Sequence, residues 1–282
     1  MLPRPLLALV LLLLSAPLFA ATPPVPEEPH FRKVMVLIFE NTDYEEAIKR
    51  PFFSSLARKG ALLSDYHAVA HPSQPNYIAL IAGDTLGVNN NKPAKLDDRH
   101  LGDLLGDAGK TWGVYAEGYP GGCFLGETSG RYARKHVPFL SFRSVQENPA
   151  LCSRVKNAAA LDSDLAAGTL PDFSLYVPNL DDDGHDTGVQ YADAWMARAF
   201  GPRLANPDFM KDLLLVVTFD EGSDAGNNRV LTLFIGDSVT PGAVSSNRYD
   251  SYNLLRTIEL GLGLGSLGRN DARAVPITGV WK

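Results

Sequence analysis

Three mainly apolar runs of strand length dominate the hydrophobic pattern of the chain, at 34–39, 173–177 and 213–219. They do not alternate with polar residues, which predicts strands buried on both faces of a sheet. Shorter apolar runs predict three further strands, at 61–66, 111–116 and 230–235.

Between these strands, apolar residues recur at helical spacing. The predicted helices cover 51–59, 96–105, 158–167, 187–200 and 249–260, and another follows Ser73 and ends near Gly83. Alternating strands and helices predict an α/β fold with a central, mostly parallel sheet sandwiched between helices. Segment 118–149 has weak periodicity, and we expect it to form an excursion over one end of the domain.

Each of the three main strands ends in a polar cluster. Glu40 and Asn41 follow the first, segment 179–186 follows the second, and Asp220 and Glu221 follow the third. A single acidic cluster is more often a turn or a helix cap. Because the carboxyl ends of parallel strands meet at one edge of a sheet, three such clusters predict a common site.

The acids of these clusters predict a metal centre. Carboxylates brought together remain ionised only if a cation or another partner offsets their repulsion. Glu40, Asp220 and Glu221, with the amide oxygen of Asn41, form an oxygen-rich set that suits one divalent metal ion. The identity of the metal does not follow from these residues.

The stretch 71–77, His-Pro-Ser-Gln-Pro-Asn-Tyr, places Ser73 between two prolines and directly before an apolar helical pattern. Pro75 is tolerated at the first position of a helix, so Ser73 is expected at a helix N-terminus, where backbone N–H groups can stabilise a phosphate. Ser73 is then either an ordinary N-cap or a nucleophile activated by the metal. The strand-end acids favour the nucleophile.

The histidines divide into two groups. His185 lies inside a strand-end cluster, where it can be a metal ligand, a phosphate donor or the acid that protonates a leaving alkoxide; a capping histidine in an acidic turn is the alternative. His30, His100 and His136 have no acidic or motif context and are expected to be surface or structural residues.

Composition adds the class of protein and its compartment. Residues 1–21 have a basic start, an apolar core and small residues at the end, which predicts a secretory signal peptide and export; 22–30 is a proline-rich leader, and 31–282 is expected to form a single domain. No later stretch predicts a membrane span. The net charge of −6 argues against a nucleic-acid or anionic-membrane binder. Cys123 and Cys152 predict one disulfide, with two free thiols as the alternative.

Four ordered segments resemble the phosphoesterase family of bacterial acid phosphatases and phosphatidylcholine-type phospholipases C, a branch of the alkaline-phosphatase superfamily. They are Glu-Asn-Thr-Asp-Tyr at 40–44, the stretch at 71–77, the segment 178–186 with its Pro-Asn-Leu start, and Thr-Phe-Asp-Glu-Gly at 218–222. The resemblance implies an alkaline-phosphatase-like fold with the metal site at the strand ends.

By the same resemblance, the family's functional residues fall on positions of this chain. The metal ligands are Glu40, Asn41, Asp220 and Glu221, the metal-bound nucleophile is Ser73, and the residues that hold phosphate and assist the leaving group are His71, Asp183 and His185. Asp181 is the alternative to Asp183. Many relatives carry a histidine before the strand at Val230, where this chain has Asn227, Asn228 and Arg229. This departure favours one metal, with Asn228 or Arg229 as a phosphate contact.

The expected function is that of an exported, metal-dependent phosphoric-ester hydrolase acting on a small phosphorylated substrate. An acid-phosphatase-type phosphomonoesterase with a phosphoseryl intermediate is preferred, because phospholipase C members of the family are usually longer. A phospholipase C or phosphodiesterase on the same scaffold is the alternative enzyme. A non-catalytic exported binding protein is the alternative from another class. The oligomeric state is not predicted.

Overall fold

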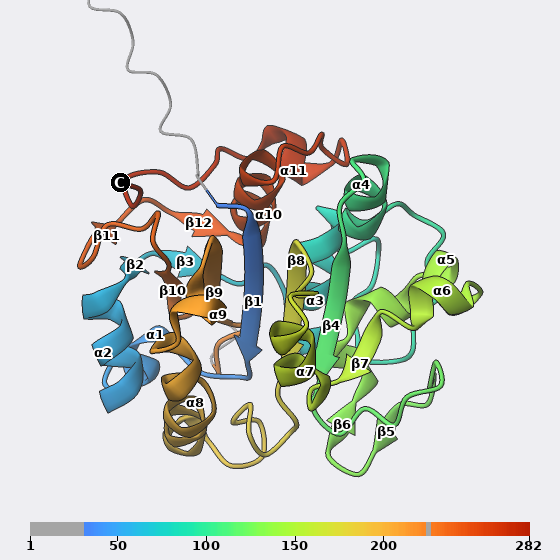
Figure 1. Ribbon diagram of the computed structural model, residues 1–282, viewed down its shortest axis with the longest axis horizontal. Coiled ribbons are helices and arrows are strands. Elements are labelled where there is room, and N and C mark those ends of the chain that lie inside the picture. Colours follow the sequence, from blue (N-terminus) through green and yellow to red (C-terminus); the bar gives the residue numbers. More distant parts are fainter. Residues whose placement is uncertain (1–30, 224–226) are drawn as a thin grey trace, which may run out of the picture.

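An eight-stranded sheet organises the computed structural model, which describes residues 31–223 and 227–282 (Figure 1). The predicted signal peptide at 1–21 and leader at 22–30 lie outside the described residues, which begin at Phe31. The strand order is β11-β2-β10-β9-β1-β8-β4-β7. These strands are β1 (Lys33–Phe39), β2 (Ala61–Leu63), β4 (Trp112–Ala116), β7 (Val155–Asn157), β8 (Phe173–Val177), β9 (Leu213–Phe219), β10 (Thr232–Ile235) and β11 (Val244–Ser245).

Strand direction in this sheet is parallel except at β10, which runs antiparallel to both of its neighbours, β9 and β2. The prediction of an α/β fold with a mostly parallel sheet is therefore confirmed. The run predicted as one strand at 61–66 divides between two sheets. Two small sheets pair β3 (Tyr66–His67) with β12 (Tyr249–Asp250) and β5 (Thr128–Ser129) with β6 (Tyr132–Ala133).

The helices occupy both faces of the sheet. They are α1 (Tyr44–Ala47), α2 (Pro51–Lys59), α3 (Ser73–Ala82), α4 (Leu101–Asp107), α5 (Arg143–Gln146), α6 (Pro149–Cys152), α7 (Ala160–Ala166), α8 (Val189–Leu204), α9 (Pro207–Met210), α10 (Ser251–Gly261) and α11 (Asn270–Arg273), with 3₁₀ helices η1 (Arg134–His136) and η2 (Pro138–Ser141). No helix of the described ranges is long and apolar enough to cross a membrane.

The end of β1 shows how the two faces are covered. Neighbouring residues of a strand point to opposite faces. The ring of Phe39 packs on Phe53 of α2 at 5.2 Å and on Trp195 of α8 at 5.8 Å. Ile38 instead lies with Tyr77 of α3 and with α10. Ile38 and Phe39 are both buried although they point to opposite faces, which explains why this strand is a continuous apolar run in the sequence.

The order β9-β1-β8 brings the three predicted polar clusters to one edge of the sheet. The backbone N–H of Glu40 donates to the Asp183 carbonyl at 3.0 Å, and the N–H of Asp220 donates to the Phe39 carbonyl at 2.9 Å. The segments that follow β1, β8 and β9 therefore begin side by side, as the parallel-sheet argument predicts.

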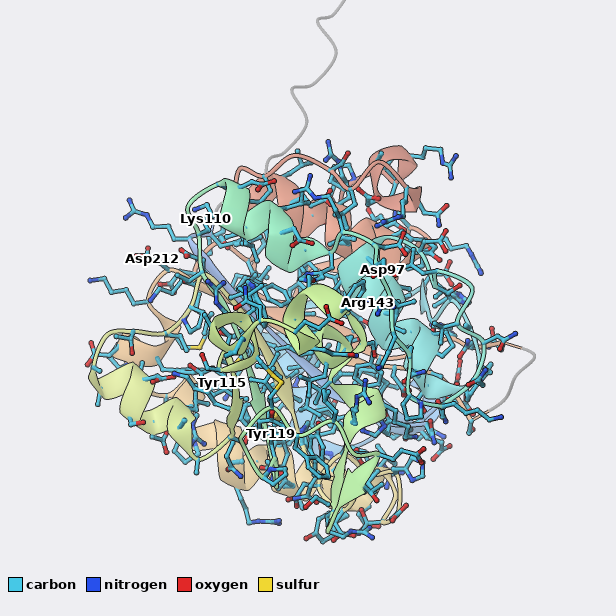
Figure 2. All side chains as sticks on the ribbon, turned by 90° about the vertical axis from the view of Figure 1, so that its right-hand side faces the viewer. Asp97, Lys110, Tyr115, Tyr119, Arg143 and Asp212 are labelled. Atoms are coloured by element: carbon cyan, nitrogen blue, oxygen red, sulfur yellow. A yellow bond between two sulfur atoms is a disulfide. The ribbon has the colours of Figure 1, made fainter. Side chains whose placement is uncertain are left out.

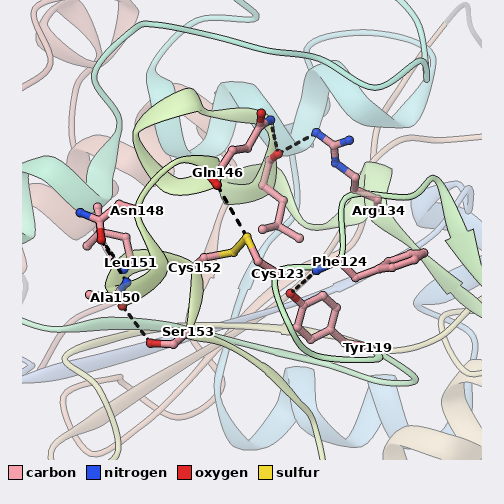
Figure 3. The surroundings of a disulfide bond; sticks show 11 residues. Tyr119, Cys123, Phe124, Arg134, Gln146, Asn148, Ala150, Leu151, Cys152 and Ser153 are labelled. Carbon is pink, nitrogen blue, oxygen red and sulfur yellow. Dashed lines mark hydrogen bonds between the residues drawn. A yellow bond between two sulfur atoms is a disulfide. The ribbon is translucent and has the colours of Figure 1, made fainter.

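The excursion predicted at 118–149 is held by a disulfide and by polar contacts (Figure 3). Cys123 and Cys152 are bonded, with their Cα atoms 5.6 Å apart, which confirms the predicted disulfide. The buried Arg134 donates hydrogen bonds to the carbonyls of Leu125, Ala94 and Leu140. At the surface, Arg143 and Asp97 form an ion pair at 2.7 Å that ties the excursion to the segment before α4; both are labelled in Figure 2.

Candidate active site

Ser73 is the first residue of α3, and its side chain is almost fully buried. Pro72, and not Ser73, occupies the N-cap position of this helix. Instead, the Ser73 Oγ lies within hydrogen-bond distance of Glu40 Oε2 at 3.1 Å and of Glu221 Oε1 at 3.2 Å, so its one proton has two possible acceptors. The interpretation of Ser73 as an ordinary N-cap is therefore wrong.

The N-terminus of α3 offers a phosphate less than predicted. Pro75 is the third residue of the helix and has no N–H. The N–H of Gln74 already donates to Asn91 Oδ1 at 3.0 Å. Two of the first three residues of α3 therefore have no free N–H for a phosphate, and other groups around Ser73 have to offset part of its charge.

Glu40, at the end of β1, is fully buried beside the nucleophile. The Tyr77 hydroxyl donates to Glu40 Oε1 at 2.5 Å, and His136 Nε2 lies 3.1 Å from the same oxygen. Burial alone would raise the pKa of Glu40, but His136, Lys135 and the Tyr77 hydroxyl outweigh it and lower that pKa to about 2. Lys135 and the Tyr77 hydroxyl thus favour the carboxylate form of Glu40, while burial lowers the pKa of His136 and favours its neutral ring.

The cluster after β9 contains buried oxygens that lack a donor. Asp220 Oδ1 accepts from the N–H groups of Asn41 at 3.2 Å and Glu221 at 2.7 Å. Asp220 Oδ2 and Asn41 Oδ1 are buried, and neither has a hydrogen-bond partner among residues 31–223 and 227–282. Burial, with Glu40 and Glu221 nearby, raises the pKa of Asp220 well above its ordinary value. A cation would satisfy these oxygens and offset this repulsion.

The residues present therefore fit a divalent metal ion. The predicted ligand set of Glu40, Asn41, Asp220 and Glu221 is rich in oxygen, as a hard cation requires. The described residues also bring together Glu40, His136 and Asp183, whose ligand atoms lie within 4.8 Å of one another. Both groups share Glu40, so they are alternative or adjoining positions for an ion.

His136 corrects a prediction, since it was expected to be a surface or structural residue without a role at the site. Its ring is buried, stacks on Tyr77 at 5.0 Å, and places Nδ1 at 3.5 Å from Asp183 Oδ2. It belongs to the excursion and follows no predicted strand, so the strand-end pattern could not identify it. His100, by contrast, is the structural residue expected, because its ring accepts from the Gly102 N–H at the start of α4. His30 lies outside the described residues.

Lys135 is a second residue that the sequence did not single out. Its Nζ donates to Ser73 Oγ at 3.2 Å and lies 4.0 Å from Glu40 Oε2. The one available signal was the run of three basic residues at 134–136 in an acidic chain. That run would have indicated a cationic patch but not its contact with Ser73.

The remaining predicted residues surround this centre. His71 Nδ1 lies 2.6 Å from Glu221 Oε2, and His185 Nδ1 lies 2.6 Å from Asp186 Oδ1. Asp183 is buried, and its Oδ1 accepts from the His185 N–H at 2.8 Å. Burial and the nearby Glu40 raise the pKa of Asp183 to about 9.

Of the two candidate aspartates, Asp183 is the one at the site. Asp181 is more exposed and forms an ion pair with Arg131 at 2.5 Å. Arg229 was one candidate for a phosphate contact, but it donates to the Ser64 carbonyl and pairs with Glu45, so this role is not supported. Asn228, the other candidate, braces the turn after β9: its Oδ1 accepts from the Gly222 N–H at 2.8 Å.

A cavity of about 250 Å³ opens beside Lys135. Its walls include the side chains of Gln74, Asn91, Leu180 and His185, together with residues of the excursion at 118–149. Because Lys135 reaches Ser73 from this wall, the cavity adjoins the nucleophile and can receive the organic part of a substrate.

Comparison with known proteins identifies the family of this chain and relatives similar to it in sequence. The model of the Phosphoesterase family matches residues 42–265. The chain is 33% identical to a probable acid phosphatase of Kluyveromyces lactis over 86% of this chain and 61% of that protein. It is 36% identical to a phosphatidylinositol-3-phosphatase of Mycobacterium tuberculosis over 90% of this chain and 84% of that protein. The chain thus spans about three fifths of the length of the fungal acid phosphatase.

Among solved structures, the fold is similar to a protein of the alkaline phosphatase superfamily from Vibrio parahaemolyticus. The TM-score is 0.60 at 13% identity, over 90% of this chain and 72% of the other. At this identity the similarity concerns the fold, which agrees with the predicted alkaline-phosphatase-like architecture.

Proposed function

Because this chain belongs to the phosphoesterase family, we propose that it hydrolyses phosphoric esters, as an exported phosphomonoesterase of the acid-phosphatase type. The observation that carries the proposal is the position of Ser73, whose hydroxyl lies between two carboxylates and a lysine. Export is supported by the predicted signal peptide and by the disulfide, which is typical of oxidising compartments.

In the proposed reaction, Ser73 Oγ attacks phosphorus while the bond from phosphorus to the leaving oxygen breaks. Ser73 Oγ lies within hydrogen-bond distance of Glu40 and Glu221, and Glu221 accepts the hydroxyl proton, because the pKa of Glu40 is held at about 2. Lys135 lies 3.2 Å from the same oxygen, where it can offset the charge that develops on the phosphoryl group.

His185 is proposed to protonate the leaving alkoxide. It lines the cavity beside Ser73, and Asp186 Oδ1 lies 2.6 Å from its Nδ1, where it can hold the Nδ1 proton. In the second half of the reaction, neutral His185 accepts a proton from the water that hydrolyses the phosphoseryl intermediate. As the bond from phosphorus to Ser73 Oγ breaks, the carboxylic acid that took the Ser73 proton returns it to Oγ, so the Ser73 hydroxyl, the carboxylate and the imidazolium are all restored.

The residues proposed to hold one divalent metal ion are Glu40, Asn41, Asp220 and Glu221. When bound, such an ion offsets the carboxylate charges and acidifies the Ser73 hydroxyl. The unpartnered oxygens of Asn41 and Asp220 support this ligand set.

The experiment that tests the proposal is an assay of the purified chain on p-nitrophenyl phosphate, with and without chelator, beside Ser73→Ala. We expect chelator to abolish the activity and the variant to lose at least about 1,000-fold in kcat, as loss of a nucleophile does. Ser55→Ala is the matched control, because its hydroxyl donates to the Phe52 carbonyl of its own helix. Full activity of Ser73→Ala, or activity that resists the chelator, would contradict the mechanism.

A second candidate substrate is favoured by the similarity to the phosphatidylinositol-3-phosphatase, of which this chain covers 84%. We propose a direct comparison of p-nitrophenyl phosphate with short-chain phosphatidylinositol 3-phosphate. A higher kcat/KM on the lipid would assign the headgroup monoester as the substrate. Cleavage of phosphatidylcholine exceeding both would instead favour the phospholipase C alternative, and binding without turnover would favour a binding protein.

A further inference from the structure

The basic side chains around Ser73 differ in what already engages them. His71 is engaged by Glu221 and His185 by Asp186, each at 2.6 Å. The guanidinium of Arg134 donates to three backbone carbonyls. Lys135, in contrast, hydrogen-bonds to the Ser73 hydroxyl, and among the described residues its nearest carboxylate oxygen is that of Glu40, at 4.0 Å.

The backbone around Lys135 is fixed from both sides. Arg134 anchors one side of η1 through its carbonyl contacts, and its side chain is buried. His136 anchors the other side by stacking on Tyr77 and by its contact with Glu40. The Lys135 side chain is 17% exposed, so its ammonium group is partly desolvated and interacts strongly with charge.

The charge around Ser73 is unfavourable for a dianion. Glu40 and Glu221 both contact the hydroxyl, and Asp220 lies beside them. The start of α3 has lost the N–H of Gln74 to Asn91 and has none at Pro75. A phosphate monoester carries close to two negative charges at neutral pH, whereas a diester carries one. A divalent ion at the proposed ligands would offset the carboxylates themselves, so the second charge of the monoester needs a cation supplied by the chain.

We infer that Lys135 binds the second negative charge of a phosphate monoester and so determines the preference of this site for monoesters over diesters. The inference rests on the proposed function and deepens it. Lys135 contacts the non-bridging oxygens of the bound phosphoryl group, and the organic group extends into the adjoining cavity. In a diester one of those oxygens carries a second organic group, and the contact with Lys135 loses most of its value.

The test compares Lys135→Met, which removes the charge and keeps an unbranched side chain one atom shorter, with Lys135→Arg, which keeps the charge. Both are assayed with the wild type on p-nitrophenyl phosphate and bis-p-nitrophenyl phosphate above pH 7, where the monoester is a dianion. We expect Lys135→Met to lower kcat/KM for the monoester about 100-fold, and for the diester less than about 10-fold. Lys135→Arg should recover part of the monoester activity. Lys156→Met, whose lysine pairs with Asp164, is the control and should change neither.

Equal losses on both esters would overturn the inference and leave the proposed function standing, because Lys135 would then act on Ser73 itself. The inference would also be overturned if the monoester-to-diester ratio of kcat/KM were the same in Lys135→Arg and Lys135→Met. Failure of the wild-type chain to hydrolyse either ester would overturn the proposed function itself. If Lys135→Met does not fold, Lys135→Gln takes its place, and the inhibition constant of inorganic phosphate is measured as well. We expect inorganic phosphate to inhibit Lys135→Gln more weakly than the wild type. Unchanged inhibition would contradict the inference.

Discussion

The two sides of the site are built in different ways. The acidic side, with Glu40, Asp220 and Glu221, follows directly from strands β1 and β9, whose residues pair in parallel along seven positions. The basic side, with Lys135 and His136, lies on a three-residue 3₁₀ helix in an irregular excursion. Strand pairing positions the acids through backbone hydrogen bonds, whereas the bases depend on a disulfide and on the contacts of a few side chains.

This difference indicates how the two sides respond to change. A strand end is stabilised by the whole sheet, so a local substitution changes its chemistry and leaves its position intact. The excursion lies outside the large sheet and contains only the short β5–β6 pair, and Arg134 and the Cys123–Cys152 bond hold it in place. We therefore expect removal of the disulfide to disturb the acidic side less than the basic side. Loss of a single charge should lower activity more on the acidic side than on the basic side.

The largest predicted effect is on the acidic side. Asp220→Asn keeps the oxygen that accepts from the Asn41 and Glu221 N–H groups and replaces the buried, unpartnered oxygen with an amide donor. An amide donor repels a cation, so we expect loss of the bound ion and a decrease of about 1,000-fold in kcat/KM. Metal content per chain and p-nitrophenyl phosphate hydrolysis are the two measurements.

The matched variant on the basic side is His136→Phe, which preserves the stacking on Tyr77 and removes both ring nitrogens. Loss of a group that orients a metal ligand costs roughly 10- to 100-fold, so this variant should retain one ion and partial activity. An ion lost from His136→Phe but retained by Asp220→Asn would show that the ion occupies the group of Glu40, His136 and Asp183 instead.

The acidic side was also the more predictable from sequence. Phe173–Val177 and Leu213–Phe219 were predicted with the bounds that the structure gives them, because both strands are buried and read as uninterrupted apolar runs. Their polar ends could then be placed by the geometry of parallel sheets. The antiparallel direction of β10 was not predicted, since an apolar run carries no information about strand direction.

The basic side was not predictable for a physical reason. The position of His136 depends on contacts with Glu40, Tyr77 and Asp183, which are far away in the sequence. The excursion has no hydrophobic period from which an element could be placed. A similar limit applies to the helix predicted at 96–105, of which the structure keeps only the part from Leu101 onward, since His100 caps its start.

An intermediate effect is predicted for the disulfide. The bond closes a loop of 29 residues, so Cys123→Ala with Cys152→Ala should lower the free energy of unfolding by about 3 to 4 kcal/mol. Urea unfolding measures this loss. The double variant should still bind the metal, because the acids stand on the sheet, while its monoester-to-diester ratio falls as Lys135 loses its fixed position. A loss below about 1 kcal/mol would show that the contacts of Arg134 suffice to hold the excursion.

The smallest predicted effect concerns Glu117, which lies where the sheet meets the excursion. Its Oε2 accepts from the backbone N–H and the side-chain amide of Asn179 at 3.1 and 2.9 Å, and its Oε1 accepts from the Tyr176 hydroxyl at 3.0 Å. Burial, together with the neighbouring Asp182, raises the pKa of Glu117 from 4.5 to about 7. Between pH 4.5 and 7 the folded chain therefore keeps a proton that the unfolded chain releases.

The free energy of unfolding contributed by Glu117 is largest below pH 4.5 and falls as the pH rises toward 7, because ionisation costs more in the folded state. Glu117→Gln removes this dependence and keeps an acceptor for Asn179 and a donor for Asp182. We expect the stability of the wild type relative to the variant to fall by about 2 kcal/mol between pH 5 and pH 7.5, measured by urea unfolding. Glu147→Gln, at a carboxylate that is 66% exposed, is the control and should parallel the wild type. If the free energy of unfolding of Glu117→Gln changed with pH in parallel with that of the wild type, Glu117 would already be ionised at pH 5. Its protonation would then contribute nothing to the pH dependence of stability.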